Sequence, residues 1–221
     1  MDMNKTIYEL NKQIHAILIN PYLSSEDFKT NCYLINKYGI KNVSTSLQYL
    51  TYLKESIIDK KVNINVLISY PFSDIPQIIL NDLSIYAKDS GADGIEYMPK
   101  YFFLSNDQDE SFANDIEQLS RSELPITLIF NKHSFEKEKL IRAIEISIDL
   151  GIKKFQFGDG FAPPIKPFEI SEILSLLRDK SFLKVVGGIR NINQVIDLLD
   201  AGVDSIGTSS FHEIFKAIKF K

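Results

Sequence analysis

The feature that most constrains this fold is an eightfold alternation of short apolar segments with longer segments of helical periodicity. The predicted strands are residues 14–19, 43–47, 64–70, 94–98, 126–130, 152–157, 182–186 and 204–207. The predicted helices are residues 24–38, 49–58, 74–89, 107–119, 135–150, 168–178 and 192–199, and residues 208–210 open a last one. Strands that alternate with helices indicate βαβ units and parallel pairing.

Eight such units in 221 residues predict a compact (β/α)8 TIM barrel. No linker or low-complexity segment interrupts residues 1–221, so we expect a single domain. The alternative is an open, doubly wound sheet, which more often carries a glycine-rich phosphate loop after its first strand. Here the first strand is followed by Asn20-Pro21, which favours the barrel.

Composition limits the classes of function. A hydrophobic content of 44% is enough for a sizeable core, and a net charge of -4 without a basic patch argues against nucleic acid or membrane partners. The polar first residues are unlike a signal peptide, and with Cys32 as the single cysteine we expect a cytoplasmic protein without internal disulfides. The three histidines lack metal-ligand spacing, so neither a metal nor a cofactor is expected.

Small residues follow the last two predicted strands. Gly187 and Gly188 come after the seventh, and Gly207, Ser209 and Ser210 come at the end of the eighth. Glycine lets the backbone approach a ligand, and helix N-termini and serine hydroxyls bind anions. In a (β/α)8 barrel these two loops are a frequent phosphate site. The pattern therefore predicts a small phosphorylated ligand.

Polar side chains also gather at the predicted carboxyl ends of the strands, where barrels place their active sites. They are Asn20, Ser44, Glu96, Asn131, Lys132, Gln156, Asp159 and Lys184. We interpret this set as the pool of candidate catalytic residues. Asp159 has a second interpretation, because an aspartate between two glycines can simply form the turn.

Six segments are similar to motifs of a known family. They read IHAILINP from Ile14, VSTSL from Val43, LISYP from Leu67, GADGIEYM from Gly91, LKVVGGIR from Leu183 and SIGTSS from Ser205. In the same order they resemble I-D-H-T-L-L-K-P, V-C-V-N-P, V-I-G-F-P, G-A-D-E-I-D-M-V, V-K-x-x-G-G-[IV]-R and R-I-G-T-S-S of the deoxyribose-phosphate aldolases. These are class I (Schiff-base) aldolases with a TIM-barrel fold, and the resemblance covers nearly the whole chain in register.

The resemblance implies that Lys184 is the family's second active-site lysine. It assigns phosphate binding to a set of small residues, which are Gly160, Gly187, Gly188, Gly207, Ser209 and Ser210. Glu96 corresponds to the fourth-strand aspartate that handles protons, and Asn131 to a fifth-strand glutamate. In the first strand, His15 and Ala16 replace the family's aspartate and histidine.

The largest departure from the family lies in the sixth strand. The family places its Schiff-base lysine in F-[IV]-K-T-S-T-G, whereas this chain reads KFQFGDG over residues 154–160. Alignment on Gly160 puts Gln156 at the lysine position, and a slip of one residue puts Phe157 there. Neither side chain can form an iminium. Without a lysine neighbour and with Glu96 as a partner, we expect Lys184 to stay protonated and to act as an electrostatic clamp.

Two other amines are alternative nucleophiles. Lys132 follows Asn131, and Lys154 lies two residues before Gln156, on the same face of the strand and deeper in the barrel. Three functions stay open: an aldolase that uses Lys184 and Glu96, a phosphometabolite-binding or regulatory barrel without lyase activity, and a non-covalent isomerase or epimerase of a phosphorylated compound. A second copy of the chain, as a homodimer, also stays open as a partner.

Overall fold

The computed structural model describes residues 9–177 and 181–219, which form a closed barrel of parallel strands in the order β1 to β8. The strands are β1 Ile14–Leu18, β2 Asn42–Ser46, β3 Asn63–Ile68, β4 Gly94–Tyr97, β5 Ile126–Phe130, β6 Lys154–Phe157, β7 Phe182–Val186 and β8 Ser205–Thr208. Pairing of β8 with β1 closes the ring, with His15 opposite Gly207. The predicted TIM barrel is confirmed.

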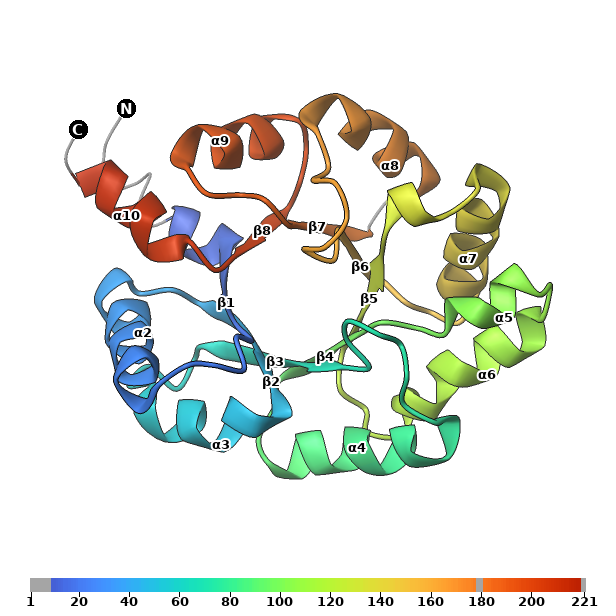
Figure 1. Ribbon diagram of the computed structural model, residues 1–221, viewed down its shortest axis with the longest axis horizontal. Coiled ribbons are helices and arrows are strands. Elements are labelled where there is room, and N and C mark those ends of the chain that lie inside the picture. Colours follow the sequence, from blue (N-terminus) through green and yellow to red (C-terminus); the bar gives the residue numbers. More distant parts are fainter. Residues whose placement is uncertain (1–8, 178–180, 220–221) are drawn as a thin grey trace.

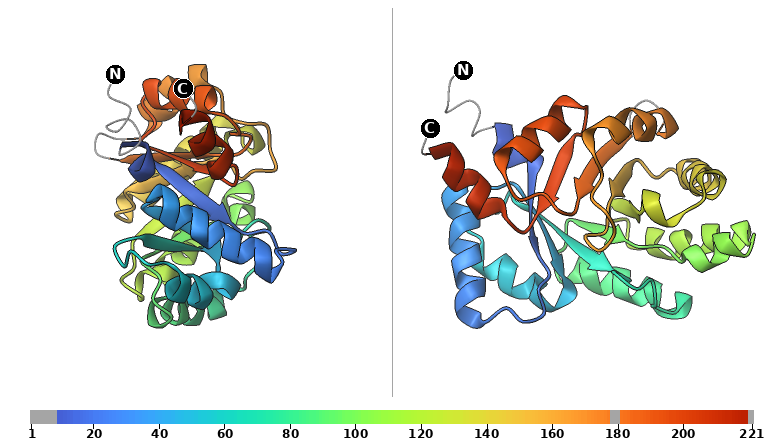
Figure 2. Two further views of the ribbon diagram at one scale, coloured as in Figure 1. Left: turned by 90° about the vertical axis from the view of Figure 1, so that its left-hand side faces the viewer. Right: turned by 45° about the horizontal axis from the view of Figure 1, so that its top comes forward.

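Helices surround the strands on the outside (Figures 1 and 2). They are α2 Ser25–Tyr38, α3 Leu47–Ser56, α4 Gln77–Asp89, α5 Tyr101–Ser105, α6 Asp109–Ser120, α7 Lys137–Asp149, α8 Ile170–Leu176, α9 Ile192–Asp200 and α10 Phe211–Lys219, with short 3-10 helices η1 Lys132–Ser134 and η2 Pro167–Glu169. Local sequence fixes several ends. A capping box joins Ser24 and Asp27 at the start of α2, and Gly39 ends this helix in the left-handed conformation.

Strand alternation divides the side chains into two sets. Outward-facing residues such as Phe155 and Val185 are buried in the apolar core between strands and helices. Inward-facing residues include polar side chains that meet across the barrel. Lys184 on β7 contacts both Ser44 on β2 and Glu96 on β4, three strands that do not pair with one another. The barrel interior is therefore partly polar.

Several predicted boundaries differ from the structure. The helix expected from residue 74 begins at Gln77, since Pro76 is its N-cap, and Thr208 belongs to β8 rather than to the last helix. The sequence analysis did not predict α5, a five-residue helix shortly before α6. The end of the predicted helix 168–178 lies outside the described residues, and α8 covers its middle.

Candidate ligand-binding and active site

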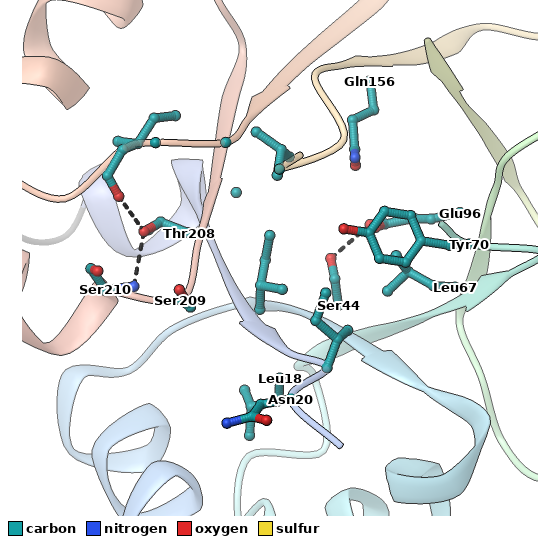
Figure 3. Close-up of a pocket in the computed structure, with 18 of the residues that line it drawn as sticks. Leu18, Asn20, Ser44, Leu67, Tyr70, Glu96, Gln156, Thr208, Ser209 and Ser210 are labelled. Carbon is teal, nitrogen blue, oxygen red and sulfur yellow. Dashed lines mark hydrogen bonds between the residues drawn. The ribbon is translucent and has the colours of Figure 1, made fainter. Parts of the chain in front are cut away.

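A cavity of about 510 Å³ opens at the carboxyl ends of the strands (Figure 3). Its polar and small lining residues are Asn20, Asn31, Ser44, Tyr70, Glu96, Gln156, Gly160, Gly187, Gly188, Arg190, Gly207, Thr208, Ser209 and Ser210. Apolar residues such as Ile17, Leu67 and Phe161 complete the wall. A volume in this range suits a small metabolite. Every glycine and serine that the sequence assigned to phosphate binding lies at this cavity.

The loops after β7 and β8 form one side of the cavity (Figure 3). Gly187 has φ 102° and lies so close to Gly160 that an added Cβ would be 3.3 Å from the Gly160 Cα atom. This backbone approach requires glycine, and it brings the β6 loop against the β7 loop. Within the described residues, the backbone N–H groups of Gly188 and Ser209 have no hydrogen-bond partner. Two donors are thus available to an anion.

Thr208 connects the same two loops. Its hydroxyl donates to the Ile189 carbonyl at 2.6 Å and accepts from the Ser210 N–H at 2.9 Å. The N–H of Ser210 is therefore committed inside the protein, and only its hydroxyl is left for a ligand. This modifies the predicted site, in which helix-terminal N–H groups acted together with both serine hydroxyls.

Arg190 is a lining residue that the sequence analysis did not single out. It follows Gly188 and Ile189 in the β7 loop, its side chain is exposed, and it forms no ion pair within the described part of the chain. A guanidinium at the edge of a cavity can bind a phosphate in a bidentate manner. Its place in the GGIR motif, two residues after the second glycine, was the signal available in the sequence.

Beside the cavity, a buried ion pair joins β7 to β4. The Lys184 Nζ atom lies 2.6 Å from Glu96 Oε1 and 2.9 Å from Ser44 Oγ, and Ser44 donates to Glu96 Oε1 at 2.7 Å. Lys184 and Glu96 are each 1% exposed. Glu96 and Ser44 line the cavity, and Lys184 lies behind them. Gly207 leaves room for the lysine stem, because an added Cβ would be 2.9 Å from Lys184 Cε.

Burial and pairing act on Lys184 in opposite directions. Burial lowers the pKa of its ammonium below the ordinary value, and the Glu96 carboxylate opposes this shift. The expectation that Lys184 stays readily protonated considered the missing lysine neighbour and the Glu96 partner but omitted burial, which is the largest effect on its pKa. The pairing with Glu96 was predicted and is present.

Gln156 lies on β6 in register with Lys184 on β7. It is 2% exposed and lines the cavity. Its Nε2 donates to the Gly158 carbonyl at 3.1 Å, and its Oε1 has no partner among the described residues. An amide oxygen buried in this way costs roughly 1–3 kcal/mol, so a ligand that donates a hydrogen bond to it would recover that cost.

Asn131 does not line the cavity, although we predicted it as a site residue. Its amide donates to Asp159 Oδ2 at 2.7 Å, and its Oδ1 accepts from the His133 N–H at 3.0 Å. Asp159 Oδ1 accepts from the N–H groups of Phe161 and Ala162. Of the two interpretations of Asp159, the structure supports the turn, and Asn131 holds this turn against the end of β5.

The two alternative amines lie away from the cavity lining. Lys132 Nζ pairs with Glu172 at 2.7 Å and Glu169 at 3.2 Å. Lys154 is exposed at the first residue of β6, so the prediction that it lies deep in the barrel is wrong. The start of a barrel strand opens to the opposite end of the barrel from the active site.

His15 lies inside the barrel near the ion pair. Its Nδ1 is 3.9 Å from Glu96 Oε1 and has no hydrogen-bond partner among the described residues. Burial, followed by the charges of Lys184 and Lys154, places the pKa of His15 well below its usual value. The ring is therefore neutral near pH 7.

Two further searches cover the described residues alone. No group of three or more His, Cys, Asp or Glu side chains there could hold a metal ion. No helix there is long and apolar enough to cross a membrane.

Comparisons with known proteins point to one family. No family model matches the chain. The deoxyribose-phosphate aldolase of Mycoplasma capricolum is 22% identical over 213 residues, covering 93% of this chain and 94% of the relative. That of Aquifex aeolicus is 28% identical over 211 residues, covering 91% and 93%. The solved structure of the aldolase QR15 superposes with a TM-score of 0.88 at 22% identity, covering 96% of each chain.

Proposed function

We propose that this chain, a divergent relative of the deoxyribose-phosphate aldolases, binds a small phosphorylated sugar-type ligand and does not cleave it through a Schiff base. The observation that carries the proposal is the position of its amines. No lysine is among the described residues that line the cavity. The family resemblance puts Gln156, or Phe157 with a slip of one residue, at the sixth-strand position of the family's lysine, and neither side chain can form an iminium.

Schiff-base catalysis requires a neutral amine that can reach a substrate carbonyl. Lys184 is the nearest candidate, but it lies behind Glu96 and Ser44 and is hydrogen-bonded to both. To attack a carbonyl it would have to leave its carboxylate partner and lose a proton. Its position suits a charge that holds the Glu96 side chain in place at the cavity wall.

The loop side of the cavity supports phosphate binding. Gly188 and Ser209, whose N–H groups have no hydrogen-bond partner among the described residues, line the cavity together with Ser210 and Arg190. Backbone donors near a helix start and a cation are the groups that phosphate sites use.

Two observations favour catalytic alternatives. The lowered pKa of Lys184 makes it easier for its ammonium to lose a proton and become a neutral amine. This favours an aldolase with Lys184 as its amine and Glu96 as its proton-transfer group. Glu96 at the cavity wall also favours an isomerase or epimerase that moves a proton without a covalent intermediate. Turnover near an ordinary enzyme rate, on the order of 10 per second, would be needed for either alternative.

The binding site is tested by a charge placed in it. Deoxyribose 5-phosphate at a hundredfold excess over its dissociation constant should stabilise the wild type by about 2.7 kcal/mol in thermal unfolding. Ser209→Glu should abolish the stabilisation, because its carboxylate repels the phosphate. Ser171→Glu, the same change at an exposed position of α8 outside the cavity, should keep it. Equal stabilisation of wild type and Ser209→Glu would place the site elsewhere.

A further inference from the structure

We propose that the wall of the cavity opposite the phosphate loops selects a ligand that donates hydrogen bonds there, so that the ligand is a phosphorylated polyol rather than a free carbonyl compound. This inference rests on the proposed function, which supplies the phosphate end. It concerns the wall formed by Ser44, Tyr70, Glu96 and Gln156, called here the acceptor wall. Figure 3 shows these four side chains on the side of the cavity away from Ser209 and Ser210.

Gln156 is the strongest part of the acceptor wall. The Gly158 carbonyl can only accept a hydrogen bond, so the amide nitrogen of Gln156 must be the atom that faces it at 3.1 Å. This fixes the orientation of the amide and leaves Oε1 as its other end. That oxygen is buried at the cavity and has no partner among the described residues. A ligand hydroxyl would satisfy it, whereas a ligand carbonyl oxygen would repel it.

Both hydroxyl groups of the acceptor wall donate their hydrogen bonds to other groups of the protein. Ser44 donates to Glu96 at 2.7 Å, and Tyr70 donates to the Asp159 carbonyl at 2.5 Å. Burial, followed by the charges of Asp159 and Glu96, raises the pKa of Tyr70 to about 12, so the phenol keeps this proton near pH 7. Toward the cavity, both oxygens have only lone pairs to offer.

Glu96 adds a charged acceptor to the same wall. Its Oε1 accepts from Lys184, which does not line the cavity, and from the hydroxyl of Ser44, which does. A carboxylate accepts hydrogen bonds only. The acceptor wall thus combines an amide oxygen, a carboxylate and two committed hydroxyls, and no described lysine or arginine lies on it.

The aldolase-type cavity has therefore changed its chemical preference. An amine at the Gln156 position would face a ligand carbonyl as a nucleophile. An amide oxygen at that position faces a ligand hydroxyl as an acceptor. Donors at the loop end and acceptors at the wall match a molecule with a phosphate at one end and hydroxyl groups at the other.

A matched pair of ligands tests this preference. Ribulose 5-phosphate has a carbonyl at C2 and cannot close a five-membered ring, because its O5 atom is phosphorylated. Ribitol 5-phosphate has a hydroxyl at C2 and is otherwise the same size. Calorimetric titration of the wild type should give a dissociation constant at least about tenfold lower for ribitol 5-phosphate, as expected for one ligand hydrogen bond to a buried acceptor.

Variants of Gln156 assign the preference to its oxygen. Gln156→Leu and Gln156→Met both remove the acceptor and should reduce the preference to within about twofold, while inorganic phosphate should bind as it does to the wild type. Two variants are used so that the test is still possible if one of them does not fold, and thermal unfolding shows which of them are folded. Gln118→Leu, the same change on α6 outside the cavity, should retain the full preference.

The outcomes separate this inference from the proposed function. If wild type binds both ligands equally while Ser209→Glu still abolishes phosphate binding, the acceptor wall is refuted and the phosphate site stands. A preference that persists in folded Gln156→Leu and Gln156→Met also refutes it. If neither ligand nor inorganic phosphate binds the wild type, the proposed function fails and this inference fails with it.

Discussion

Replacing Lys184 by methionine should destabilise the protein strongly, although methionine fills most of the same volume. The change leaves Glu96 buried, with Ser44 as its remaining direct donor and His15 Nδ1 at 3.9 Å. Removing one partner of a buried ion pair typically costs about 3–5 kcal/mol, because the other charge stays desolvated. In a protein of this size that corresponds to a fall in melting temperature of roughly 6–20 °C.

A double-mutant cycle measures the coupling directly. Urea unfolding at pH 7 would be recorded for wild type, Lys184→Met, Glu96→Leu and the double variant. The double variant should recover most of the loss, since it buries neither charge. Lys88→Met is the control, because Lys88 and Glu123 form an exposed pair, with side chains 45% and 81% accessible, and its loss should change stability little.

One result would refute this reasoning. If Lys184→Met costs less than about 1 kcal/mol, like the exposed control, the lysine and carboxylate do not form a desolvated pair. The assignment of Lys184 as a fixed charge that orients Glu96 would then be wrong.

Two further predictions concern His15 and Gln156. Below pH 6.5, His15 becomes protonated in the unfolded chain, whereas the buried ring of the folded protein, with its lowered pKa, stays neutral, so the free energy of unfolding falls on acidification. In His15→Gln, the free energy of unfolding from urea titrations should therefore fall less between pH 6.5 and 5, by up to about 1.4 kcal/mol per pH unit. An unchanged dependence of this free energy on pH would contradict the prediction. Gln156→Lys should place an amine of depressed pKa beside Lys184. Borohydride should then trap deoxyribose 5-phosphate at residue 156, and recovery of unmodified protein would count against the predicted position.

Much of the fold could be predicted from the sequence, because the information is local. Apolar runs that end in Gly187-Gly188 or Pro71 set the strands, and the helices repeat with a period that neighbouring residues define. The helix α5 was not predicted, because its five residues are too few to show a helical periodicity in the sequence. Predicted and observed helix boundaries differ where a capping residue sets the first residue of the helix, as Pro76 does for α4.

The candidate site was predictable at the residues that motifs or strand ends mark. Glu96, Gln156 and the loop glycines and serines all line the cavity. The sequence could not show which hydrogen bonds form between residues that are far apart in the chain. Asn131 is committed to Asp159, 28 residues away, and Tyr70 to the same turn, 89 residues away. Such contacts depend on tertiary packing, so the sequence did not show that Asn131 lies outside the cavity lining or that Tyr70 belongs to it.

The most direct test of the central claim is borohydride reduction of the wild-type protein with deoxyribose 5-phosphate, followed by intact mass. The side-chain amines near the cavity are paired or lie outside its lining, so we expect the protein mass to be unchanged under conditions that trap the adduct in Gln156→Lys. A wild-type adduct that peptide mapping places at Lys184 would contradict the account, because this lysine would then leave Glu96 and act as the Schiff-base nucleophile.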